Sequence, residues 1–106
     1  MTLETVKNAL LSVLPDVYHH TGPANKPDQY IVWAEDGAGN VVHADNVMVC
    51  QAIEGTVDYF TKAENDPNFE RVQDALTAAG IPFYLNSIQW EEETGFIHYE
   101  WVFNIG

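Results

Sequence analysis

The sequence predicts an α+β fold, in which two α-helices pack on one face of a mainly antiparallel β-sheet in the order α-β-β-β-α-β-β. Two segments repeat apolar residues every three or four positions, as helices with one buried face do. The other segments are alternating or rich in β-branched and aromatic residues, and the short loops between them favour antiparallel neighbours. The 106 residues fit a single domain, residues 1–106, with one core.

The first helix is predicted to begin after Thr2, a candidate N-cap, and to end at Leu14, because Pro15 disfavours helical geometry at the residue before it. Its apolar face comprises Leu3, Val6, Leu10, Val13 and Leu14. The following "DVYHHTG" predicts a short strand or an extended segment, and "GPANKP" predicts a loop.

The central strands are predicted from two apolar runs. "QYIVWAED" is β-branched and aromatic, and "DGAGN" at Asp36–Asn40 predicts a hairpin turn after it. The next run is long for one strand, so we expect Asp45–Asn46 to interrupt it and Val47–Thr61 to form the main strand. Gly55 predicts a bulge within that strand.

The second helix has clear start and stop signals. Asp66 is a good N-cap, Pro67 fits the first helical position, and Gly80 can take the left-handed conformation that ends a helix. Its predicted buried face comprises Phe69, Val72, Leu76 and Ala79.

A two-stranded hairpin is predicted at the C-terminal end. Phe83–Glu91 and Ile97–Ile105 are the strands, joined through "EEETG", in which Gly95 can supply a positive φ. Apolar residues change from odd to even positions within the first of these strands. We therefore expect a bulge near Asn86 and Ser87.

The charge excludes simple binding to a phosphate backbone. The net charge is -12, from sixteen acidic and four basic residues, and the bases are scattered: Lys7, Lys26, Lys62 and Arg71. Acidity is compatible with solubility, with a basic partner, or with a surface past which nucleic acid moves without sticking. The lone Cys50 fits an intracellular protein, and we expect neither a secretion signal nor a membrane span.

We expect no catalytic residue, no cofactor site and no metal site. In a strand, His19 and His20 point to opposite faces, and no metal-ligand spacing includes His43 or His98. The remaining candidates fit structural roles. Cys50 lies in an apolar run, Ser12 and Ser87 lack a nucleophile motif, Glu91–Glu93 sit at a solvated hairpin tip, and Trp33, Trp90 and Trp101 fit a core or a subunit interface.

The segment from Tyr59 to Ile105 resembles a family of tailed-bacteriophage and prophage proteins that act in tail completion, as tail terminators or in head-tail joining. The matching features are "YFTK", the short helix, "GIPF", and the "ETG" hairpin followed by an aromatic last strand. The resemblance implies a virion protein, a subunit of a hexameric ring that caps the tail tube and joins it to the head connector. It also implies that DNA passes through the lumen.

Two other classes of function remain open. A small acidic inhibitor or adaptor could mimic nucleic-acid charge against a basic partner, in which case its carboxylates should gather in one stripe. An enzyme would require a deep pocket that gathers carboxylates or histidines with perturbed pKa values.

Overall fold

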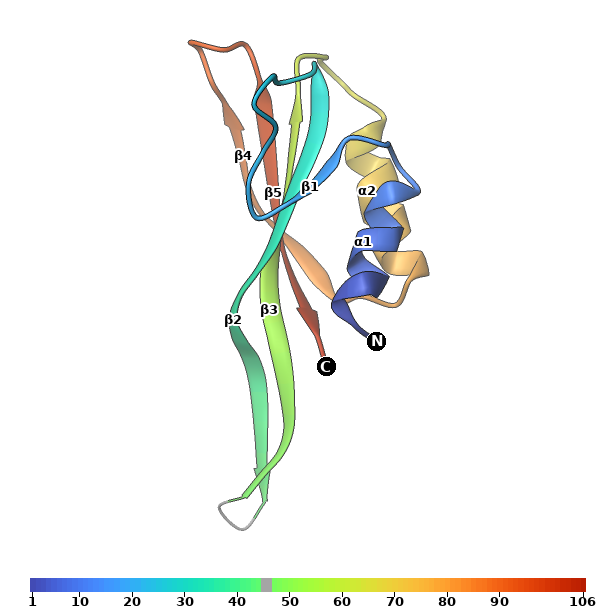
Figure 1. Ribbon diagram of the computed structural model, residues 1–106, viewed down its shortest axis with the longest axis vertical. Helices are drawn as coiled ribbons and strands as arrows, with labels where there is room; N and C mark the ends of the chain where they lie inside the picture. The colour runs from blue at the N-terminus through green and yellow to red at the C-terminus, as the bar shows by residue number, and fades with distance from the viewer. Residues whose placement is uncertain (45–46) are drawn as a thin grey trace.

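The computed structural model contains one five-stranded sheet and two helices (Figure 1). It describes the backbone of residues 1–44 and 47–106, and the side chains of residues 1–38 and 52–106. The predicted order of elements is confirmed: α1 (Leu3–Leu11), β1 (Val17–His19), β2 (Gln29–Ala44), β3 (Val47–Thr61), α2 (Asn68–Ala78), β4 (Phe83–Trp90) and β5 (Ile97–Ile105). Within the described residues, no helix is long and apolar enough to cross a membrane.

The strands lie in the order β1-β2-β3-β5-β4, and the sheet is mainly antiparallel, as predicted. The short strand β1 differs, because it pairs with β2 in parallel. The expectation that consecutive strands are antiparallel is wrong here. Residues 20–28 run back to the starting end of β2, and Gly22 lies against Val32 and Tyr30 on the way.

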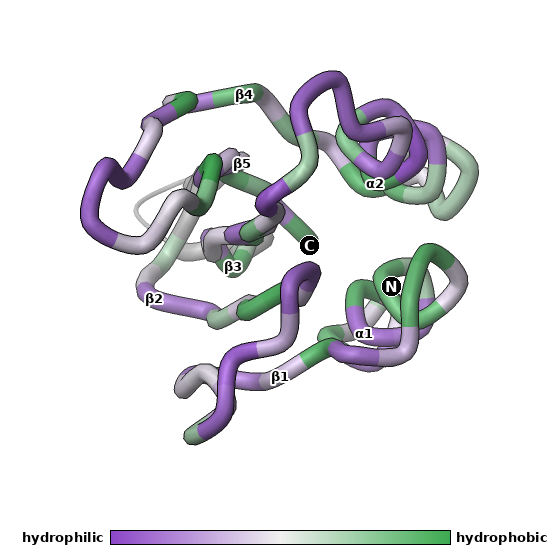
Figure 2. The backbone as a smooth tube through the Cα atoms, turned by 90° about the horizontal axis from the view of Figure 1, so that it is seen from above, coloured by the Kyte–Doolittle hydropathy of each residue, from purple (hydrophilic) through white to green (hydrophobic). Residues whose placement is uncertain are grey.

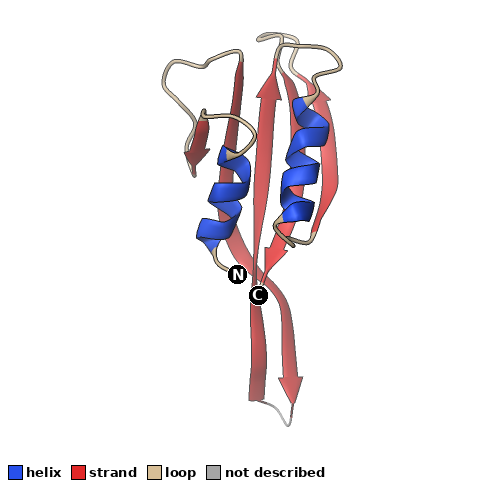
Figure 3. Cartoon of the chain, turned by 90° about the vertical axis from the view of Figure 1, so that its right-hand side faces the viewer, coloured by secondary structure: helices blue, strands red, loops and turns tan. Residues whose placement is uncertain are grey.

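Both helices cover the same face of the sheet, which confirms the predicted layers (Figure 3). The core between the layers contains Val6 and Leu10 from α1 and Val72 and Leu76 from α2. The sheet contributes the largest buried side chains, which include Ile31, Trp33, Val57, Tyr59, Trp101 and Phe103.

Helix α1 ends three residues earlier than predicted, at Leu11 instead of Leu14. Pro15 has no N–H group, so it cannot donate to the carbonyl of Leu11 four residues earlier. The Ser12 hydroxyl donates to the Ala9 carbonyl at 2.5 Å and closes the last turn. Leu14 is nevertheless buried in the core.

Helix α2 has the predicted termini. The Asp66 carboxylate accepts a hydrogen bond from the backbone N–H of Asn68 at 2.9 Å, while Pro67 already has helical angles. Gly80 has a φ of 74°. The N–H of Ile81 donates to Leu76 at 2.9 Å, and the N–H of Gly80 donates to Thr77 at 3.0 Å, which together form a Schellman C-cap.

Strands β2 and β3 extend beyond the rest of the sheet as a two-stranded arm (Figures 1 and 3). Strand β5 pairs with β3 only from Ile53 to Thr61, whereas the pairing of β2 with β3 continues to Ala44 and Val47. The arm gives the molecule its length, with extents of 51 × 25 × 24 Å.

Two predictions about this region are wrong. Residues 36–40 form no hairpin turn, because they lie within β2, where register shifts between Glu35 and Gly37 and between Ala38 and Val41 absorb the extra residues. The extra residue opposite Gly55 is therefore on β2 rather than on β3. The predicted interruption at Asp45–Asn46 lies outside the described residues.

Candidate assembly interface

Strand β4 forms one edge of the sheet, and among the described residues it pairs only with β5. A register shift between Leu85 and Ser87 confirms the predicted bulge. Because of this shift, the apolar residues on both sides of the bulge lie opposite residues of β5 that face the helices. The pairs are Phe83 with Phe103, Leu85 with Trp101, Ile88 with Tyr99, and Trp90 with Ile97.

No helix covers the outer half of β4. Figure 2 shows β4 at the margin of the sheet. The exposed fractions are 38% for Leu85, 55% for Ile88 and 67% for Trp90. We call these three residues the β4 strip. Trp33 and Trp101 belong to the core as predicted, whereas Trp90 lies on the surface.

Strand β4 has a bulge between Leu85 and Ser87, which is one protection of an exposed edge, but it lacks two others. Natural sheets commonly place charged residues or prolines on such edges, to prevent pairing with other chains. Strand β4 has the sequence FYLNSIQW, which contains neither. In a chain with sixteen acidic residues, an uncharged edge with an exposed tryptophan is a candidate docking surface.

The opposite edge of the sheet is also open. Strand β1 pairs only with Ile31–Trp33 of β2. In the part of the chain that the structure describes, the outer edge of β2 beyond these residues has no neighbouring strand. One copy therefore offers two different edges, β4 on one side and β2 on the other.

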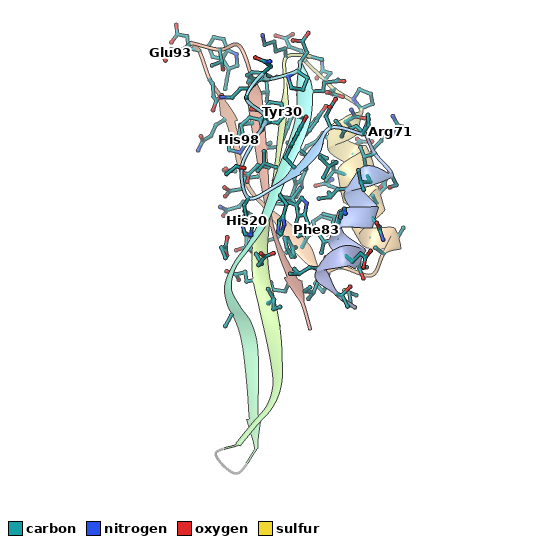
Figure 4. All side chains as sticks on the ribbon, viewed as in Figure 1. His20, Tyr30, Arg71, Phe83, Glu93 and His98 are labelled. Atoms are coloured by element: carbon teal, nitrogen blue, oxygen red, sulfur yellow. The ribbon has the colours of Figure 1, made fainter. Side chains whose placement is uncertain are left out.

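The acidic residues come from many elements. Helices α1 and α2, strands β2, β3 and β5, and the β4–β5 hairpin all contribute carboxylates. Glu92 and Glu93 are exposed at the hairpin tip as predicted, and Figure 4 shows Glu93 there. The four basic residues lie on four separate segments: α1, the β1–β2 loop, the residue after β3, and α2.

Asp66 is the centre of a hydrogen-bond network that joins α2 to the sheet. Its carboxylate accepts from the Tyr59 hydroxyl at 2.5 Å and from the Gln29 amide at 2.9 Å, and Asn68 donates to Tyr59 at 3.1 Å. Burial, together with the bond to Asp66, raises the pKa of Tyr59 to about 12. Burial alone would raise the pKa of Asp66, but the hydrogen bonds, led by those from Thr61 and Tyr59, lower it. These hydrogen bonds attach α2 to the sheet, and this structural role accounts for the network without a catalytic one.

His98 lies on the other face of the sheet, where its ring stacks on Phe60 at 4.3 Å. Its Nε2 is 2.6 Å from Asp58. Burial favours the neutral ring, but the hydrogen bond to Asp58 outweighs it and raises the pKa of His98. Figure 4 shows His98 near Tyr30, and Tyr30 stacks on the same Phe60 at 4.7 Å.

The prediction for His19 and His20 is wrong, because their rings lie together. His20 has a φ of 70°, so it does not continue the alternation of β1. The two rings stack at 4.1 Å, and Nε2 of each lies within 3.0 Å of a Glu35 oxygen. The amino-acid pattern gives no signal of this backbone angle.

Comparisons with known proteins identify a similar fold. A chain of a solved structure described as "Virion of native gene transfer agent (GTA) particle" superposes with a TM-score of 0.56. The match covers 93% of this chain and 88% of that chain at 11% sequence identity. No protein-family model matches the sequence, and no curated protein does. At this identity the likeness is one of fold.

The other residues singled out in the sequence occupy ordinary positions. Ser12 caps α1 and Ser87 adjoins the β4 bulge. The side chains of His43 and Cys50 lie outside the described residues. The sequence pattern placed Ile88 and Trp90 on the inward phase of β4, but it could not show that the helix layer stops short of them.

Proposed function

We propose that this chain is a structural protein of a phage or prophage virion, a subunit of a ring, six copies in number, that caps the tail tube and joins it to the head connector. The observation that carries the proposal is the β4 strip, an uncharged apolar edge on a strongly acidic protein. The similarity of fold to a chain of a gene transfer agent virion supports it. The motifs from Tyr59 to Ile105 support it independently.

A closed ring requires two different patches that fit each other. The β4 strip of one copy and the open edge of β2 on the next copy are such a pair, because both have unpaired backbone groups. Pairing them would extend one sheet across the subunit boundary. It would also bury Ile88 and Trp90, and buried aromatic anchors contribute much of the energy of an interface.

The charge fits passage of DNA without specific binding. A lumen rich in carboxylates repels the phosphate backbone, so DNA moves through it freely. The spread of carboxylates over nearly all elements supports a ring subunit over an acidic inhibitor, which would need them in one stripe. The expected location is the host cytoplasm before assembly and the head-tail interface of the virion afterwards, with no membrane partner.

The test is assembly with the proteins encoded by the genes that neighbour this one, among which we expect a tail-tube protein. We expect negative-stain electron microscopy of the mixture to show rings at tube ends. Trp90→Asp should abolish the rings and leave the folded monomer intact, because it places a charge in the subunit boundary. Leu11→Asp is the matched control, since Leu11 is 42% exposed on α1, away from β4. Rings that form equally well with Trp90→Asp would refute the role of the β4 strip. Absence of any complex with tail proteins would refute the virion role.

A further inference from the structure

His20 has an unusual backbone conformation at the end of β1. A φ of 70° is uncommon for residues other than glycine and is a strained backbone conformation. The surrounding structure holds it in place, because the N–H of His20 donates to the Trp33 carbonyl at 2.8 Å. The consequence is that the His20 ring lies on the same side of the sheet as the His19 ring.

The two rings form a stack with Trp33. The His19 ring lies 4.0 Å from the Trp33 ring, with an angle of 16° between the planes, and 4.1 Å from the His20 ring. Trp33 is buried in the core, so it fixes the position of the stack. In this stack His19 lies between Trp33 and His20. Nε2 of both histidines contacts the same neighbouring side chain.

That neighbour is Glu35, two residues after Trp33 on β2. One carboxylate oxygen lies 3.0 Å from Nε2 of His19, and the other lies 2.7 Å from Nε2 of His20. Two imidazoles and a carboxylate therefore converge from two adjacent strands.

We propose that His19, His20 and Glu35 bind a divalent transition-metal ion of the zinc class. Two imidazole nitrogens and one carboxylate oxygen are a common protein donor set for such an ion, with water in the fourth position. The side chains are partly exposed, at 43%, 53% and 28%, so an ion can enter from solvent.

The spacing of the donor atoms requires little rearrangement. Donor atoms around a tetrahedral zinc ion lie about 3.4 Å apart. The three donor atoms here lie within 4.8 Å of one another, and both histidine–carboxylate distances are already at or below 3.0 Å. Binding mainly requires the ion to replace the direct contacts between the imidazoles and Glu35. The bound ion would then tie the short edge strand β1 to β2 at the base of the arm.

The test is calorimetric titration of the untagged protein with zinc chloride near neutral pH, with cobalt(II) as a spectroscopic probe. We expect saturable binding of a single ion per chain and the visible absorption bands of four-coordinate cobalt. His20→Ala and Glu35→Gln should each weaken binding about tenfold or more.

His98→Ala is the matched control. Asp58, His98 and Glu100 form the other described group of three potential metal ligands, but it has a single imidazole. We expect His98→Ala to bind zinc as the unmodified protein does. Circular dichroism without metal shows that each variant is folded. Lack of saturable binding below about 0.1 mM zinc, or equal affinities in all variants, would overturn the proposal. A loss that follows His98 instead would overturn it as well.

Discussion

Gly55 lies where β3 passes between a neighbouring strand and a buried aromatic ring. A Cβ atom at this position would lie against the carbonyl oxygen of Ala34 and 2.5 and 2.7 Å from Cζ and Cε1 of Phe103. The oxygen belongs to the backbone of β2, and Phe103 is fully buried opposite Gly55 on β5. Neither the backbone oxygen nor the buried ring can move away from an added Cβ atom without disturbing its own packing.

The substitution Gly55→Ala should therefore destabilise the fold strongly. Overpacking a filled core costs about 1–3 kcal/mol, and we expect the upper end because backbone cannot rotate away as a side chain can. For a domain of about this size, each kcal/mol lowers Tm by about 4–8 °C. The expected decrease in Tm is then roughly 12–24 °C.

Urea denaturation measures the loss in free energy of unfolding. Tryptophan fluorescence can follow it, because Trp33 and Trp101 are buried. The matched control is Gly37→Ala on β2, where a Cβ atom would meet nothing within 4 Å. We expect the control to stay within about 0.5 kcal/mol of the unmodified protein. Equal stability of Gly55→Ala and Gly37→Ala would refute the close packing of β2, β3 and β5 at this point.

Three further substitutions test the caps and the ionisable pairs. Asp66→Ala should cost about 2–4 kcal/mol in urea denaturation, because it removes the α2 cap and a partner of the buried Tyr59 hydroxyl. Since the folded pKa of Asp66 is lowered, this difference should be constant near neutral pH and shrink as pH falls below the ordinary value of 3.8. Gly80→Ala should lower the free energy of unfolding by about 1–2 kcal/mol, because its φ is 74°. Asp58→Asn should lower the pKa of His98 in an NMR titration, since Asp58 is what holds that pKa up. The stabilisation from this pair is fully present below the ordinary histidine value of 6.5 and is lost as pH rises through the raised pKa.

Each of these substitutions has a contradicting result. A pH-independent difference for Asp66→Ala across the acid range would mean that the carboxylate charge is not involved. An unchanged stability of Gly80→Ala would contradict the left-handed cap. An unchanged His98 titration in Asp58→Asn would mean that the ring gains its proton affinity elsewhere.

The limits of α2 and the bulge in β4 follow from the sequence. Asp66, Pro67 and Gly80 define the limits of α2 because their preferences act within one helical turn. The shift of apolar phase in β4 predicts its bulge, because each strand residue alternates between two faces. Such signals depend on neighbours close in sequence.

Sequence patterns misplaced features that depend on distant partners. The pattern "DGAGN" has turn chemistry, yet pairing with β3 keeps it extended. Strand β1 is parallel to β2 because the loop of residues 20–28 returns across the sheet, and no local preference specifies that path. Alternation predicts opposite faces for His19 and His20, but His20 has a φ of 70° and the Thr21 N–H donates back to the His19 carbonyl, so the alternation ends there.

The candidate interface and the candidate metal site both depend on tertiary structure. Ile88 and Trp90 follow the same apolar alternation as Tyr99 and Trp101 on the neighbouring strand. Ile88 and Trp90 are exposed whereas Tyr99 and Trp101 are buried, because the helix layer covers β5 and does not reach the outer half of β4. The sequence determined which positions of the strands carry apolar side chains. Only the reach of the helices across the sheet decided which of them remain available to another chain, since burial depends on what packs above a residue and not on its own period.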